Sequence, residues 1–186
     1  FINSGEVAIP EIQRPFVWKP KQVRDLIDSL YNGYPTGYLI ISQSPNMRLK
    51  DGTLSEGKKI MIDGQQRVTA MMTAILGKEV LNEDFEKKVI KISFNPFAEE
   101  GEETFKVLDN AILKDKRWIP DISVFFQNGF SSRKFINAYC EANPEADGDA
   151  LEEKVTKMTD IKNRNIGVIT LGKDLSVDEV TEIFIR

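Results

Sequence analysis

The sequence changes from a strand pattern to a helix pattern within residues 59–77, KIMIDGQQRVTAMMTAILG. Residues 59–63 form a short apolar run, which predicts a buried strand. After Gly64, residues 65–76 carry apolar side chains at helical spacing, and Gly77 is a typical stop signal. A strand, a glycine and a helix are therefore expected in direct succession. The predicted core face of this helix consists of Val68, Met71, Met72 and Ile75.

A second strong helix is predicted at residues 21–31, where apolar residues recur at i, i+3, i+4, i+7 and i+8 between Pro20 and Gly33. The chain shows no regular β–α–β alternation, which argues against a doubly wound fold. The predicted fold class is α+β, with a mixed sheet, flanking helices and a mostly helical insertion. Shorter patterns predict strands at 6–10, 37–43, 89–95, 104–108 and 165–171, and helices at 121–128, 131–142, 149–163 and from 177 onward.

Composition restricts the chemistry that this chain can perform. Its 186 residues contain no histidine, which excludes histidine bases, histidine metal ligands and an HNH-type nuclease centre within the chain. The single cysteine, Cys140, excludes an internal disulfide and a multi-cysteine zinc site. A net charge of −4 argues against a broad cationic surface for nucleic acid. No apolar run is long enough for a membrane span, and the composition favours a cytoplasmic location.

The junction at residues 63–67, Asp-Gly-Gln-Gln-Arg, is a candidate phosphate site. The first N–H groups of a helix lack intrahelical partners, and the helix dipole attracts negative charge there. Gly64 permits close approach of the backbone to a ligand, Arg67 can form a paired hydrogen bond with phosphate, and Asp63 can hold Mg²⁺ or orient a water. The alternative interpretation is purely structural, with Asp63 as a helix cap and both glutamines solvated.

A second candidate is the stretch 9–18, Ile-Pro-Glu-Ile-Gln-Arg-Pro-Phe-Val-Trp. Its two prolines and two aromatic residues indicate an ordered, extended segment that fixes Gln13 and Arg14 in position. Trp18 is either an anchor beneath the helix at 21–31 or a platform for a base. The alternative for Arg14 is an ion pair in a packed loop. The charged runs at 114–117 and 99–103 are interpreted as solvated surface and an acidic turn.

Taken together, these stretches resemble the N-terminal domain of GmrSD-type restriction proteins, a family similar in fold to ParB and sulfiredoxin. The resemblance rests on Ile-Pro-x-x-Gln-Arg-x-x-x-Trp at 9–18, on Gly-Tyr-Pro-x-Gly at 33–37 and on Asp-Gly-Gln-Gln-Arg at 63–67. It is dense over residues 7–76 and looser over 167–186. It implies a bacterial defence protein in which this domain binds and hydrolyses a nucleoside triphosphate with Mg²⁺. The implied catalytic residues are Asp63 and Arg67, and the implied nucleotide- and phosphate-binding residues are Gln13, Arg14, Gly64, Gln65, Gln66 and Arg67.

The change of sequence pattern near residue 121 predicts a domain organisation, and the resemblance implies partners. We expect a ParB-like nucleotide-binding core at 1–120, a helical insertion at 121–164, and a return strand and helix at 165–186. The chain begins at Phe1 rather than Met, and it stops inside a predicted helix that opens with a capping box at 176–179. A fragment of a longer protein is therefore expected. A downstream HNH-type nuclease domain or subunit would act on DNA in the full-length protein.

Three functions are compatible with these patterns. The first is a nucleotide-dependent regulatory domain that licenses cleavage elsewhere. The second is a ParB-like DNA-binding or DNA-nicking module, in which the same arginines hold the phosphodiester backbone and Lys19, Lys21 and Arg24 form a local basic patch. The third is a scaffold that binds no ligand. The motif pattern and the acidic balance favour the first.

Overall fold

A computed structural model describes residues 7–8, 15–42 and 59–172 of the chain. The candidates Gln13 and Arg14, the predicted loop at 44–58 and the predicted helix from 177 lie outside these ranges. The described residues divide into two compact units. The first takes those within 1–15, 37–65 and 166–186, and the second takes 16–36 and 66–165.

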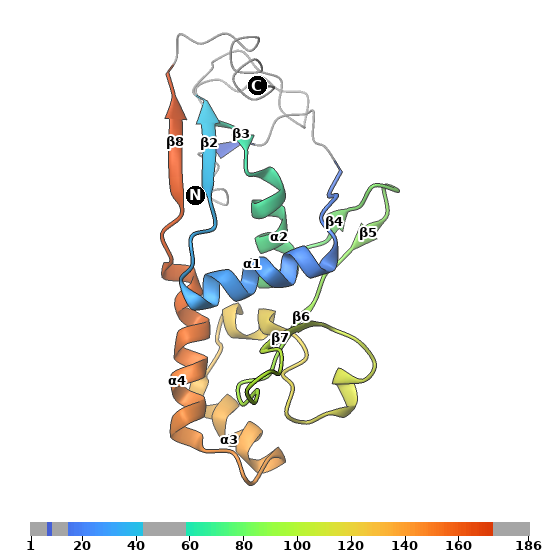
Figure 1. The fold of residues 1–186 in the computed structure, drawn as a ribbon, viewed down its shortest axis with the longest axis vertical. Helices are drawn as coiled ribbons and strands as arrows, with labels where there is room; N and C mark the ends of the chain where they lie inside the picture. The colour runs from blue at the N-terminus through green and yellow to red at the C-terminus, as the bar shows by residue number, and fades with distance from the viewer. Residues whose placement is uncertain (1–6, 9–14, 43–58, 173–186) are drawn as a thin grey trace. The chain divides into compact units, whose positions relative to one another are not determined.

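The first unit is built on a four-stranded mixed sheet in the order β1-β3-β2-β8 (Figure 1). β1 (Val7–Ala8) runs parallel to β3 (Lys59–Asp63), and β3 runs antiparallel to β2 (Tyr38–Ser42). β8 (Gly167–Leu171) returns from more than a hundred residues downstream and pairs in parallel with β2. The strands predicted at 6–10, 37–43, 59–63 and 165–171 are therefore present within the described ranges, and the predicted mixed sheet is confirmed.

The two central strands of this sheet, β2 and β3, contribute buried side chains at facing positions. Ile41 and Met61 face each other as Cα partners, and both are 1% exposed. Tyr38 pairs with Gly167 at the other edge of β2. A Cβ atom at residue 167 would come within 2.5 Å of the Tyr38 ring, so this close approach requires glycine.

The second unit contains α1 (Pro20–Asn32), which begins with proline at its first turn and ends at Gly33. Gly33 has φ 73°, the left-handed conformation that suits glycine at a helix C-terminus. The apolar face predicted from the 3.6-residue period is the face that the structure buries. It consists of Val23, Leu26, Ile27, Leu30 and Tyr31.

A short hairpin, β6 (Ile92–Phe94) and β7 (Phe105–Val107), packs its aromatic residues against α1. Phe94 stacks on Phe105 at 5.2 Å between ring centroids, and Tyr31 meets both rings. The predicted pairing of 89–95 with 104–108 is thus confirmed, although both strands are shorter than predicted. A second hairpin, β4 (Val80–Leu81) with β5 (Lys87–Lys88), was not predicted, because two-residue strands leave no periodicity to detect.

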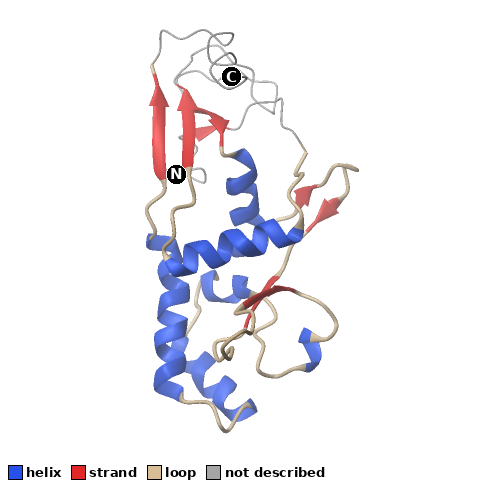
Figure 2. Cartoon of the chain, in the orientation of Figure 1, coloured by secondary structure: helices blue, strands red, loops and turns tan. Residues whose placement is uncertain are grey.

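The later part of the second unit is helical, as predicted (Figure 2). α3 (Ser132–Ala142) is capped by the Ser131 side chain, and α4 (Gly148–Thr159) is capped by Asp147. The predicted helix at 121–128 is a 3-10 helix, η2 (Ile122–Phe126). Two further 3-10 helices are η1 (Ile112–Lys114) and η3 (Asp160–Asn163), and the latter extends α4.

The helix α2 (Gln65–Leu76) has the predicted bounds, but its predicted core face is only partly correct. Val68 is buried as expected, whereas Met71, Met72 and Ile75 are half-buried. The inward face is instead completed by small side chains, because Ala and Thr permit close packing and Thr73 satisfies a buried donor, the Ile90 N–H, at 2.8 Å. The buried residues of α2 are Val68, Ala70, Thr73 and Ala74.

The fold class is α+β, as the sequence predicts. The domain boundaries proposed at 120 and 164 stay predictions. The two compact units do not show which residues form a nucleotide-binding core and which form an insertion. None of the helices within the described ranges is long and apolar enough to cross a membrane.

Candidate functional site

The Asp-Gly-Gln-Gln-Arg motif occupies the turn from β3 into α2. β3 ends at Asp63, α2 begins at Gln65, and Gly64 between them has φ 94°. That backbone conformation is strongly unfavourable for residues with a Cβ atom, so glycine is needed for the turn. The motif crosses the division between the compact units, with residues 63–65 in the first and residues 66–67 in the second.

Within the first unit, the motif follows the C-terminal end of β3, an interior strand of the sheet. Asp63 is solvent-exposed and is the Cα partner of Ile40 on β2, beside an irregularity in the pairing. Gly64 is buried. The Gln65 side chain turns back and donates from Nε2 to the Met61 carbonyl at 3.1 Å. Gln65 thereby ties the first helical residue to the strand that precedes it.

Within the second unit, the next two side chains bind backbone atoms of distant segments. Oε1 of Gln66 accepts a hydrogen bond from the Val17 N–H at 3.0 Å. Nη1 of Arg67 donates to the Thr36 carbonyl at 3.0 Å. Both side chains are half-buried. The glutamines are therefore bonded to the chain rather than simply solvated, as the structural alternative supposed, and Thr36 is a partner that the sequence analysis did not identify.

Asp63 is the candidate metal ligand, and its position fits only a Mg²⁺ ion that is bound together with a nucleotide. Among the described residues, no group of three or more acidic, histidine or cysteine side chains could hold a metal ion. Mg²⁺ bound with a nucleotide needs only one or two protein carboxylates, because phosphate oxygens and waters supply the other ligands. An exposed aspartate at a strand end fits that mode and does not fit a metal held by protein alone.

The second candidate stretch enters the described ranges only at Pro15. Its aromatic residue Trp18 is half-buried and packs against the core cluster of the second unit. This packing favours the anchor interpretation of Trp18 over a platform for a base. Phe16, two residues earlier, is 6% exposed and also belongs to that core.

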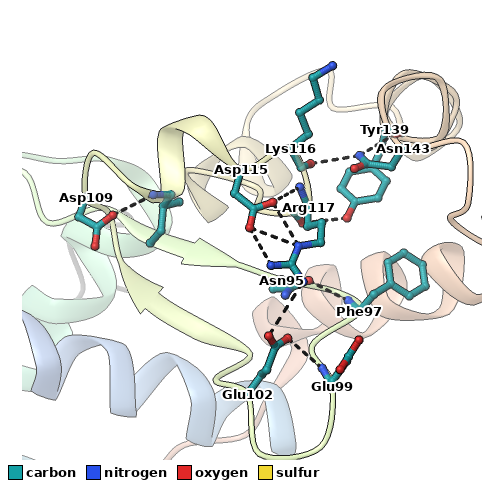
Figure 3. A network of polar contacts seen from close by, with 11 residues as sticks. Asn95, Phe97, Glu99, Glu102, Asp109, Asp115, Lys116, Arg117, Tyr139 and Asn143 are labelled. Carbon is teal, nitrogen blue, oxygen red and sulfur yellow. Dashed lines mark hydrogen bonds and ion pairs between the residues drawn. The ribbon is translucent and has the colours of Figure 1, made fainter.

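The charged run at 114–117 takes part in a polar cluster in the second unit (Figure 3). Arg117 pairs with Asp115 at 2.9 Å and approaches Glu102 at 4.0 Å. The Tyr139 hydroxyl on α3 donates to the Arg117 carbonyl at 2.8 Å. The run was expected to be solvated, and three of its four residues are exposed, while Asp115 and Arg117 are also ion-paired. This cluster joins the acidic turn and the 115–117 loop to α3, so its role is structural.

Comparison with protein families agrees with the motif. The family model described as the GmrSD restriction endonuclease N-terminal domain matches residues 1–186, the whole chain. This chain belongs to that family. The match confirms the resemblance drawn from the residues at 9–18, 33–37 and 63–67.

Part of this family member is also similar to a curated archaeal protein. It is 31% identical over 91 residues to the uncharacterized protein MJ0686 of Methanocaldococcus jannaschii. The similar region covers 39% of this chain and 15% of that protein, so the chain corresponds to a small part of its relative.

Replacing Gln66 with alanine is expected to loosen the segment at Val17. The Val17 N–H would lose its acceptor, and a hydrogen bond of this kind contributes about 1 kcal/mol. Amide exchange at Val17 should therefore become faster, by up to about fivefold, in hydrogen exchange followed by NMR. Gln65→Ala is the matched control, since Gln65 bonds to Met61 instead. Equal exchange at Val17 in the wild type and in Gln66→Ala would contradict this assignment.

The polar cluster of Figure 3 predicts a pH-dependent contribution to stability. The hydrogen bond from the Arg117 side chain lowers the pKa of the Asp115 carboxyl. A carboxyl whose pKa is lower in the folded state stabilises the fold above its unfolded pKa, about 3.9, and loses that contribution as the pH falls through its folded pKa. Asp115→Asn should therefore lower Tm at neutral pH, and the difference from the wild type should shrink below about pH 4.

The control for this measurement is Asp84→Asn, at an exposed position with no ion pair to another described residue. Its Tm should follow that of the wild type at every pH. A deficit in Asp115→Asn that stays constant down to about pH 2 would show that the charge of Asp115 does not matter to the cluster.

Proposed function

We propose that this chain is a nucleotide-binding, NTP-hydrolysing regulatory domain of a bacterial DNA-restriction or phage-defence protein, and that it controls a nuclease module elsewhere in the system. The observation that carries the proposal is the succession of β3, a glycine with positive φ and the twelve-residue helix α2. Such a turn presents the positive end of a helix dipole and the backbone at the start of a helix, which together favour a phosphate group. The family description as part of a restriction endonuclease supports the context.

The residues of the motif take distinct roles in this proposal. The backbone at 64–66 receives phosphate oxygens, and Gly64 lets them approach closely. Arg67 adds a charge-assisted hydrogen bond from the first turn of α2. Asp63 holds Mg²⁺, which when bound would neutralise charge on the phosphates. Gln13 and Arg14 complete the binding residues. The chain contains no Walker A sequence, so this would not be a P-loop site.

The absence of histidine from the sequence agrees with a regulatory role. An HNH-type nuclease needs histidine, and this chain of 186 residues has none. DNA cleavage would therefore be carried out by a different domain or subunit, and this domain would report nucleotide state to it. DNA would be a partner of the full-length protein.

The alternative is a DNA-binding or DNA-nicking module that uses the same arginines. Lys19 and Lys21 are exposed at the start of α1, as a basic patch requires. Arg24, the third member of the suggested patch, is paired with Asp25 and Glu103. The hydrogen bond from Arg24 lowers the pKa of Glu103, so the carboxylate stays charged and offsets the patch. Because this pairing weakens the basic patch, we favour the nucleotide-binding proposal over the DNA-binding alternative.

The test is a panel of ATP, GTP, CTP and UTP with Mg²⁺ on the full-length protein, with binding followed by calorimetry and hydrolysis by phosphate release. At least one nucleotide should bind. Arg67→Ala should weaken that affinity about 10- to 100-fold, since a charge-assisted hydrogen bond contributes roughly 1.5–3 kcal/mol. Asp63→Asn should abolish the dependence on Mg²⁺ and most of the hydrolysis.

Two exposed residues serve as controls for these substitutions, Arg133 on α3 and Asp84 between β4 and β5. Arg133→Ala and Asp84→Asn should bind and hydrolyse nucleotide as the wild type does. Absence of nucleotide binding by the wild type would refute the proposal. Salt-sensitive binding of duplex DNA that needs no nucleotide and is lost in Arg67→Ala would then establish the alternative.

A further inference from the structure

Three cationic side chains from distant parts of the chain meet the segment that contains the C-terminal end of α1 and the residues after it. We call residues 31–36 the α1 turn. Arg67 donates to the Thr36 carbonyl at 3.0 Å, at one end of the turn. Arg164 donates to the Tyr31 carbonyl at 3.3 Å, and Lys157 donates to Oδ1 of Asn32 at 3.0 Å, at the other end. All of these residues belong to the second compact unit.

Arg164 completes the C-terminus of α1. The last carbonyl groups of a helix have no intrahelical partner, and the Arg164 guanidinium supplies one for Tyr31. The same group lies against Gly33, where a Cβ atom would stand 3.2 Å from Nη1. Glycine at residue 33 therefore permits both the left-handed turn and the close approach of Arg164.

Lys157 adds a second cation at the same helix end. Its Nζ lies 4.1 Å from the centroid of the Tyr31 ring, a distance typical of a cation–π contact. Burial lowers the pKa of Lys157, and repulsion from Lys154 and Arg164 lowers it further. Positive charge is thus gathered at the negative end of the α1 dipole, where it stabilises the helix end.

We infer that Arg164 and Lys157 are positioning residues for Arg67, and that they act through the α1 turn. The two residues hold Tyr31 and Asn32, only a few positions before the carbonyl that Arg67 contacts. Pro35 lies between and restricts the backbone at both Tyr34 and its own position. Displacement of one end of the turn would therefore move the Thr36 carbonyl and reorient the Arg67 guanidinium. The inference rests on the proposed function for what Arg67 binds, but not for how Arg67 is held.

It follows that the helical segment after residue 121 helps to position Arg67 of the motif. Lys157 lies on α4 and Arg164 directly follows η3, so both come from the predicted insertion or its end. A ligand on Arg67 and a change in α4 would influence each other, because a coupling between two sites is reciprocal.

The first test needs no ligand. The full-length protein is labelled with ¹⁵N-arginine, and the Nε–Hε resonance of Arg67 is assigned from its loss in Arg67→Lys. Arg164→Ala should shift or broaden this resonance, and Arg164→Lys should restore it in part, because an ammonium group can still donate to the Tyr31 carbonyl. The matched control is Lys162→Ala, which removes an exposed cation of η3 that makes no hydrogen bond or ion pair to another described residue.

An Arg67 resonance that is unchanged in folded Arg164→Ala would overturn the inference. If Arg164→Ala fails to fold, Lys157→Met takes its place, since methionine retains packing on Tyr31 while removing the charge. A general loss of stability would change many resonances, whereas the positioning role predicts a change at Arg67 and at the α1 turn.

The second test is a double-mutant cycle on nucleotide affinity. Arg164→Ala should weaken binding about tenfold in the wild-type background and should have no further effect when Arg67 is already alanine, because coupled residues are not additive. Equal effects in both backgrounds would overturn the inference. If the wild type binds no nucleotide, the proposed function fails, and the Arg67 resonance still decides whether Arg164 positions it.

Discussion

Backbone polar groups in connecting segments need partners, and in this domain the first turn of α2 provides two of them. The Val17 N–H lies before α1 and the Thr36 carbonyl lies after it. Gln66 and Arg67 bind one each. Two adjacent side chains of one motif therefore bind the segments that precede and follow α1. These two hydrogen bonds add to the apolar packing that places α1, and one of them orients Arg67.

The motif therefore has a structural role in addition to its proposed role in phosphate binding. Gly64 and the start of α2 supply geometry suited to a phosphate, while Gln65, Gln66 and Arg67 hold neighbouring strands and segments in place. A side chain that is already bonded to the backbone is preorganised, so it loses less conformational freedom when a ligand binds. Structural contacts of Arg67 are therefore compatible with a role in binding, and they explain how the guanidinium could be kept in one orientation.

Four of the five arginines in the described ranges connect segments of the chain. Arg24 and Arg117 pair with carboxylates, whereas Arg67 and Arg164 bind backbone carbonyls. Cations used in this way contribute little to an open basic surface. Together with the net charge of −4, this pattern favours a compact anionic ligand such as a nucleotide over an extended DNA backbone.

The elements around the motif were predictable because their patterns are strong. The change of period at Gly64 located β3 and α2, and the spacing between Pro20 and Gly33 located α1. The inward face of α2 was misjudged, since hydrophobic periodicity gives little weight to Ala70, Thr73 and Ala74. Thr36 could not be predicted as a partner, because a backbone carbonyl has no sequence signature. The roles of Gln13 and Arg14 stay predictions.

Hydrogen exchange on the full-length protein tests whether the turn into α2 receives nucleotide phosphates. Amide exchange is measured with and without a nucleoside triphosphate and Mg²⁺. We expect slower exchange at residues 64–68 when nucleotide is present, because bound phosphate would cover the backbone at the start of α2. Nucleotide binding that protects other segments and leaves residues 64–68 unchanged would contradict this expectation.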